Sequence, residues 1–133
     1  MQSRERAFDA KGNMKHQYPL PILDENGTED DDEYQPPIAI AKDKKIITHG
    51  FDDEQMHVCD SSGELKYSFP TKELDVDLLS ISDENEIIAA EMFSKFVYIY
   101  TEEGNEKRKF EVPEDHLVMD LAFNHVSKKV IVL

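Results

Sequence analysis

One sequence pattern occurs three times along this chain, and its spacing restricts the folds that the chain can adopt. The three copies are Gly12–Tyr18, Gly63–Phe69 and Gly104–Phe110. In each copy a lysine stands three positions after the glycine and an aromatic residue stands six positions after it. A glycine in this setting indicates a tight hairpin turn that needs positive φ, and the lysine and the aromatic residue then belong to the strand that follows.

A second pattern alternates with the first. Short apolar segments centred on Ile40, Ile81 and Phe123 are each followed by a polar turn and an apolar pair. The centres of these segments lie 41 and 42 positions apart, and the last two turn glycines lie 41 apart. A strand-like repeat with a period near forty is typical of a propeller blade of four strands. The sequence therefore predicts an all-β chain, a β-propeller segment of four-stranded antiparallel blades.

The repeat divides residues 1–133, taken as a single domain, into two complete blades and two halves. Residues 37–69 and 76–110 each carry four strand patterns, whereas 5–18 carries only the last two and 118–133 only the first two. We therefore expect an incomplete ring. Two interpretations stay open: the chain is a fragment of a longer propeller, or it forms a homodimer in which two copies complete a six-bladed ring.

The strand, turn and strand series Val58–Phe69, preceded by Ile38–Ala41 and Ile46-Ile47, resembles the NHL repeat. More loosely, the chain resembles the propellers of TRIM-type proteins, and the resemblance covers about residues 5–133. It implies a recognition module, because the sequence holds neither a zinc-ligand cysteine set nor a heptad run for ligase domains. The loop before the third strand departs from the family pattern, with Asp52-Asp53-Glu54 in one copy and Phe93-Ser94-Lys95 in the other.

Net charge limits the classes of partner. The formal charge of −14 argues against nucleic acid, whose phosphates are neutralised by lysine and arginine, and against anionic membrane surfaces. Preferred partners are then basic or neutral proteins or peptides. The lone cysteine, Cys59, cannot form an internal disulfide, and no apolar run approaches the roughly 18 residues of a membrane span, so we expect a cytoplasmic protein.

An acidic inter-blade loop, residues 21–36, is the one insertion in the repeat. It contains the run Asp30, Asp31, Asp32 and Glu33, and its carboxylates are suited to a basic peptide or to calcium. The order of an EF-hand loop fails, because Gly27 comes too early in the acidic stretch. We expect a solvated loop that contributes to partner binding, with no metal and no cofactor.

Two phenylalanines are candidate anchors for a partner. Phe51, followed by Asp52 and Asp53, and Phe93 both occur in the loop between the second and third strands of a blade. Apolar anchors with a polar rim are typical of protein-recognition surfaces. The alternative is that each ring is tucked between blades.

Catalytic motifs are missing from the sequence. The histidines are scattered, and no nucleophile elbow or phosphate loop occurs. The spacing places His57 and Cys59 on one face of a strand, where we expect packing rather than metal binding. We predict a non-catalytic protein-binding platform. The alternatives are a calcium-dependent, lactonase-like propeller hydrolase, for which Asp120 and Asn124 are the candidates nearest the inner strands, and a nucleic-acid-binding NHL domain.

Repetition also predicts packing. We expect Tyr18, Phe69 and Phe110 to occupy equivalent positions in successive blades, and the three apolar strand centres to do the same.

Overall fold

A computed structural model describes residues 4–8, 11, 13–19, 36–50, 54–72 and 74–133. In this part of the chain all regular structure is β, and no helix is long and apolar enough to cross a membrane. The strands are β1 (Arg4–Phe8), β2 (Met14–Pro19), β3 (Ile38–Ile40), β4 (Ile46–His49), β5 (Gln55–Cys59), β6 (Leu65–Pro70), β7 (Leu78–Ile81), β8 (Ile87–Ala90), β9 (Phe96–Tyr100), β10 (Glu106–Glu111), β11 (Leu121–Asn124) and β12 (Lys129–Val132).

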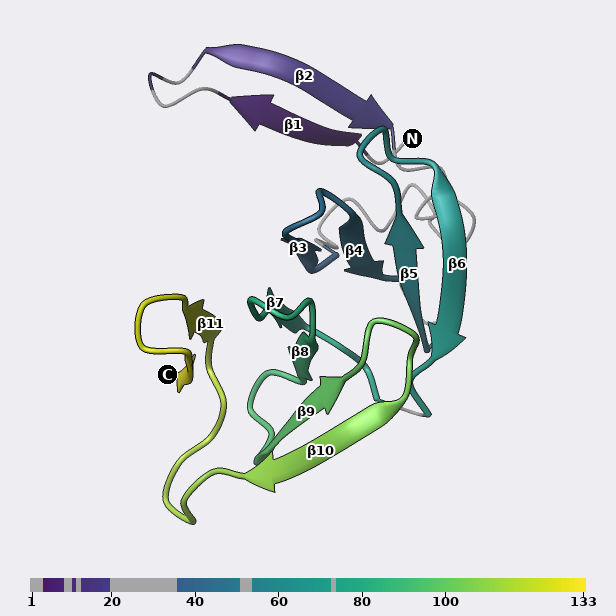
Figure 1. Ribbon diagram of the computed structural model, residues 1–133. Coiled ribbons are helices and arrows are strands. Elements are labelled where there is room, and N and C mark those ends of the chain that lie inside the picture. Colours follow the sequence, from purple (N-terminus) through teal and green to yellow (C-terminus); the bar gives the residue numbers. More distant parts are fainter. Residues whose placement is uncertain (1–3, 9–10, 12, 20–35, 51–53, 73) are drawn as a thin grey trace, which may run out of the picture.

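The strands form antiparallel sheets arranged as a fan (Figure 1). Strands β3–β6 form one four-stranded sheet and β7–β10 form another, while β1–β2 and β11–β12 are two-stranded. In Figure 1, β3, β7 and β11 lie nearest the centre of the fan, and β6 and β10 lie on its outside. The inner strands are in contact, β3 with β7 and β7 with β11. This confirms the prediction of an all-β propeller segment with four-stranded antiparallel blades.

The turns and the strand pairing of the hairpins repeat from blade to blade, as the sequence pattern does. The two turn glycines, Gly63 and Gly104, have φ values of 92° and 100°, and each donates a 3.0 Å backbone bond to the residue three positions before it. Glycine populates such backbone angles without a steric penalty, which confirms the prediction for these turns. The β1–β2 hairpin has the register of β5–β6: Arg4 pairs with Pro19 as Gln55 pairs with Pro70. By register, β1–β2 therefore corresponds to the third and fourth strands of a blade.

Each central blade is buried on both faces. Every residue of β4 and β8 is buried, whereas the outer strands β6 and β10 are largely exposed. In β8, Ile87 and Ala89 belong to the apolar cluster shared with the first blade, and Ile88 and Ala90 belong to the cluster shared with β11–β12. Side chains alternate across a strand, so a strand that is covered on both faces carries buried residues at successive positions, as Ile87 to Ala90 do in β8.

The packing predictions hold at some positions and fail at one. Phe69 is buried at 6% exposure and Phe110 is half-buried, while the side chain of Tyr18 lies outside the described residues. Ile81 is buried against the first blade, but Ile40 is 59% exposed. The expectation of equal environments is wrong for Ile40, because the matching face of β3 has no inner strand packed on it in the described part of the chain.

Packing also accounts for the pair on β5. Cys59 is fully buried, and His57 is 3% exposed with its Nδ1 atom 2.7 Å from the Ser68 hydroxyl. Burial raises the pKa of the Cys59 thiol. These environments fit the structural role that we expected for both residues.

Candidate partner-binding surface

The loop between β8 and β9 of the second blade is held by backbone bonds on two sides. The Phe93 N–H donates to the Val118 carbonyl at 2.7 Å, and the Val118 N–H donates to the Ser94 carbonyl at 2.8 Å. On the other side, the Met92 N–H donates to the Asp77 carboxylate at 2.9 Å. The side chains of this loop are therefore presented from an ordered backbone.

Phe93 stands out from this loop. Its side chain is 59% exposed, and its φ is 66°, in the left-handed region that is unfavourable for a bulky aromatic residue. Strained residues of this kind persist where neighbouring contacts hold them, and they cluster at functional sites. The bond to Val118 provides such a contact. The alternative that Phe93 is tucked between the blades is wrong.

Three further exposed apolar residues belong to the two segments that the Phe93–Val118 bond joins. Leu117 and Met119 flank the buried Val118 and are 47% and 49% exposed, and Met92 is 40% exposed. We call Met92, Phe93, Leu117 and Met119 the Phe93 patch. Exposed apolar residues on an ordered backbone are typical of a protein interaction site.

Acidic residues are frequent in and next to the segments that carry the Phe93 patch. The residues within or adjoining its segments that carry carboxylates are Asp75, Asp77, Glu91, Glu114, Asp115 and Asp120. Lys95 is the basic residue of the same loop. The rim is therefore negative, which favours a partner that carries positive charge.

The predicted site residues have different outcomes. Phe93 is exposed as an anchor must be, while Phe51, Asp52, Asp53 and the run from residue 30 to 33 lie outside the described residues. Sequence reasoning missed Met92, Leu117 and Met119. The alternation of Leu117, Val118 and Met119 gives a signal for two outward residues, but their proximity to Phe93 depends on a backbone bond that spans 25 positions.

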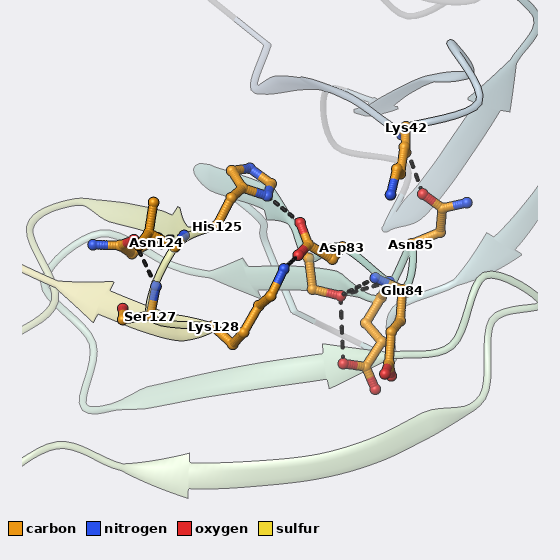
Figure 2. Close-up of polar contacts among 11 residues, drawn as sticks. Lys42, Asp83, Glu84, Asn85, Asn124, His125, Ser127 and Lys128 are labelled. Carbon is orange, nitrogen blue, oxygen red and sulfur yellow. Dashed lines mark hydrogen bonds and ion pairs between the residues drawn. The ribbon is translucent and has the colours of Figure 1, made fainter.

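A polar cluster joins the β3–β4, β7–β8 and β11–β12 turns, which follow the innermost strand of each sheet (Figure 2). The Lys42 N–H donates to Asn85 Oδ1 at 3.1 Å, which links the turns of the first and second blades. Asp83 lies between His125 and Lys128 and pairs with both, which links the second blade to β11–β12. These contacts connect each turn to the next and help to hold the blades in their fan.

Beside these turns lies a hollow of about 420 Å³ whose lining includes Ile38, Ile40, Ser80 and Asp83. The two candidates for inner-strand chemistry are engaged with backbone. Asp120 Oδ1 accepts from the Leu121 N–H at 2.8 Å, and Asn124 Oδ1 accepts from the N–H groups of Val126 and Ser127. In the described residues no group of three or more histidine, cysteine, aspartate or glutamate side chains is placed to hold a metal ion.

Four-stranded antiparallel blades in a fan define this chain as a β-propeller segment. Similar solved structures include a streptogramin B lyase, with a TM-score of 0.59, 13% identity and 96% of this chain covered, and virginiamycin B lyase from Staphylococcus aureus, with 0.56, 15% and 90%. The RRP9 WD40 repeats are also similar, with a TM-score of 0.56, 11% identity and 96% coverage. The chain spans only 38% to 44% of the length of these three structures. At these identities the likeness shows the fold alone. No protein-family model matches the chain, and no curated protein matches it significantly.

Proposed function

We propose that this chain is a non-catalytic, NHL-like propeller module that binds a basic or neutral protein partner through the Phe93 patch. The observation that carries this proposal is the exposed Phe93 ring, held at positive φ by its bond to Val118. A rigid apolar anchor limits the ordering cost of binding, because its backbone is already fixed. The acidic rim around it adds attraction for positive charge.

Selection of displayed random twelve-residue peptides on the purified chain tests this proposal. We expect the selected peptides to be rich in lysine or arginine and to contain an apolar residue that contacts Phe93. Phe93→Ala should weaken their binding at least about tenfold, since an anchor residue contributes about 2 kcal/mol or more. The urea midpoint should stay the same, because the ring is mostly outside the core.

Val126 supplies the matched control, since it is 94% exposed and lies on the β11–β12 turn, away from the loop that carries Phe93. Val126→Ala should leave peptide binding unchanged. Equal binding of the selected peptides to Phe93→Ala and to the parent chain would refute the proposal. Tight, stoichiometric calcium binding in a calorimetric titration would favour the hydrolase instead.

We also propose that the protein acts in the cytoplasm. Its single thiol, Cys59, is free and buried, which fits a reducing compartment. Fractionation of cells that express the tagged protein tests this, and a secreted or membrane-bound pool would contradict it.

A second proposal concerns self-association. In the described residues β12 pairs only with β11, and β1 pairs only with β2, so both offer an edge for pairing. The β1–β2 hairpin has the register of third and fourth strands, which β11–β12 needs to become a four-stranded blade. We propose that β12 pairs with β1 of a second copy, so that two copies close a six-bladed ring. Sedimentation velocity of the 133-residue chain should then show one discrete dimer. A monomer or a polydisperse aggregate would rule this ring out.

A further inference from the structure

An open groove of about 600 Å³ lies between the first two blades. Its walls include Lys72 and Glu91 near one end, Tyr98 and Tyr100 of β9 along its length, and Glu106 of β10 near the other end. This volume lies in the range of about 300 to 1,000 Å³ that is usual for ligand sites. None of the four residues of the Phe93 patch lines the groove, although Glu91 lines it and is also one of the acidic residues near that patch.

Tyr100 brings an unsatisfied polar group to this groove. The residue is only 5% exposed, and its ring packs on Phe69 at a centroid distance of 5.8 Å. Within the described ranges its hydroxyl has no hydrogen-bond partner, and the residue lines the groove. Buried tyrosine hydroxyls usually find a partner, and here the groove is where a ligand can supply one.

Negative charge lies close to that hydroxyl. Glu106 stands directly opposite Tyr100 in the β9–β10 register, so the two side chains are cross-strand neighbours. Burial, together with the Glu106 carboxylate, raises the pKa of the Tyr100 phenol to about 12. The hydroxyl therefore stays protonated at neutral pH, and the groove presents one phenol and one carboxylate side by side as acceptors.

A cation already occupies the outer part of the same row of rings. Phe96, Tyr98 and Tyr100 alternate along one face of β9, and the Lys109 ammonium lies 4.2 Å from the Phe96 centroid and 5.3 Å from the Tyr98 centroid. Aromatic faces attract cations through the ring quadrupole. Tyr98 and Tyr100 both line the groove, and Tyr100 comes after the two rings beside Lys109 and lies opposite Glu106.

We propose that this groove binds an arginine side chain of a basic partner, with the guanidinium donating to the Glu106 carboxylate and the Tyr100 hydroxyl. The proposal rests on the protein-binding function proposed above and adds the chemistry of the partner. Arginine suits the site better than lysine, because its planar fork donates to two acceptors at once, stacks on aromatic rings and is weakly hydrated. Lys72 also lines the groove and Lys109 lies over the Tyr98 ring, so the selectivity for arginine rests on the paired acceptors Glu106 and Tyr100 and not on the net charge of the groove.

Calorimetric and NMR titration of the intact chain with a hexa-arginine peptide tests the groove. We expect amide shifts at Tyr98, Tyr100 and Glu106, and weaker binding of hexa-lysine. Glu106→Gln and Tyr100→Phe should each weaken hexa-arginine binding about fivefold to tenfold, as loss of a charge-assisted bond or of an acceptor would. Thermal midpoints of both variants should stay within a few degrees of the parent.

Glu84→Gln is the charge-matched control, because Glu84 is exposed on the β7–β8 turn and does not line the groove. It should change hexa-arginine affinity less than twofold. Equal losses in Glu84→Gln and Glu106→Gln would show general attraction to an acidic protein and would overturn the proposal, as would the absence of amide shifts along Tyr98 to Glu106. The Phe93→Ala variant separates the two proposals. If the selected peptides bind this variant as well as the parent chain, the Phe93 patch is refuted, while binding of hexa-arginine in the groove stands. If the variant loses the selected peptides but hexa-arginine causes no amide shifts along the groove, only the groove proposal is refuted.

Discussion

Phe69→Ala should lower the free energy of unfolding by about 3 to 5 kcal/mol, the usual loss for a buried phenylalanine. Phe69 is 6% exposed in the apolar cluster shared by the first two blades, with its ring against Tyr100 and over the backbone of Gly104. Removing the ring leaves a cavity between blades that are held by backbones on both sides, so the site collapses poorly. Urea unfolding followed by circular dichroism measures the loss.

Phe110 provides the comparison, because it occupies the same position on β10 but is only half-buried. Phe110→Ala should cost less than half as much as Phe69→Ala, since it withdraws less apolar area from the core. A loss below about 1 kcal/mol for Phe69→Ala would mean that β6 is misplaced and that the contact between the blades is not as described.

The repeat made the architecture predictable because each blade needs the same types of residue at the same positions of its turns and buried strands. Gly63 and Gly104 are both needed at positive φ, and the paired isoleucines of β4 and β8 are both needed where a strand is buried on two faces. These are local requirements, so they leave a visible period in the chain. The environment of Ile40 was not predictable in the same way, because burial depends on the neighbouring blade and not on the strand itself.

The surfaces were harder to predict than the strands. Phe93 was identified as a candidate anchor, but its exposure depends on the bond to Val118 and on an unusual φ, neither of which the amino-acid pattern shows. No pattern in the sequence singled out Tyr98 and Tyr100. Their role as walls of a groove depends on Pro70 and Lys72 of the preceding blade, and on the register that places Glu106 opposite Tyr100. Sites made by two repeats together are not encoded within either repeat.

Gly104→Ala should also destabilise the protein strongly, by about 3 kcal/mol, for two separate reasons. The backbone at Gly104 has φ of 100°, which side-chain-bearing residues rarely adopt. In addition, a Cβ atom at this position would lie 2.6 Å from the Phe69 ring, so the aromatic ring or the turn would have to move. Glu103→Ala, in the same turn but exposed, should change stability by no more than about 0.5 kcal/mol.

The double variant Phe69→Ala/Gly104→Ala separates the two causes. Phe69→Ala removes the ring atoms that the new methyl group would meet at 2.6 and 2.9 Å, while the contact with the Cβ of residue 69 at 2.8 Å and the backbone strain at φ 100° remain. The double variant should therefore lose less stability than the two single variants added together, by about 1 to 3 kcal/mol, the usual coupling between residues in contact. Strict additivity in urea unfolding would show that the turn of the second blade does not rest on Phe69. A clear coupling would establish that Gly104 serves both its own turn and the packing against Phe69 of the preceding blade, so that at this position the sequence pattern reflects contact between blades as well as the turn itself.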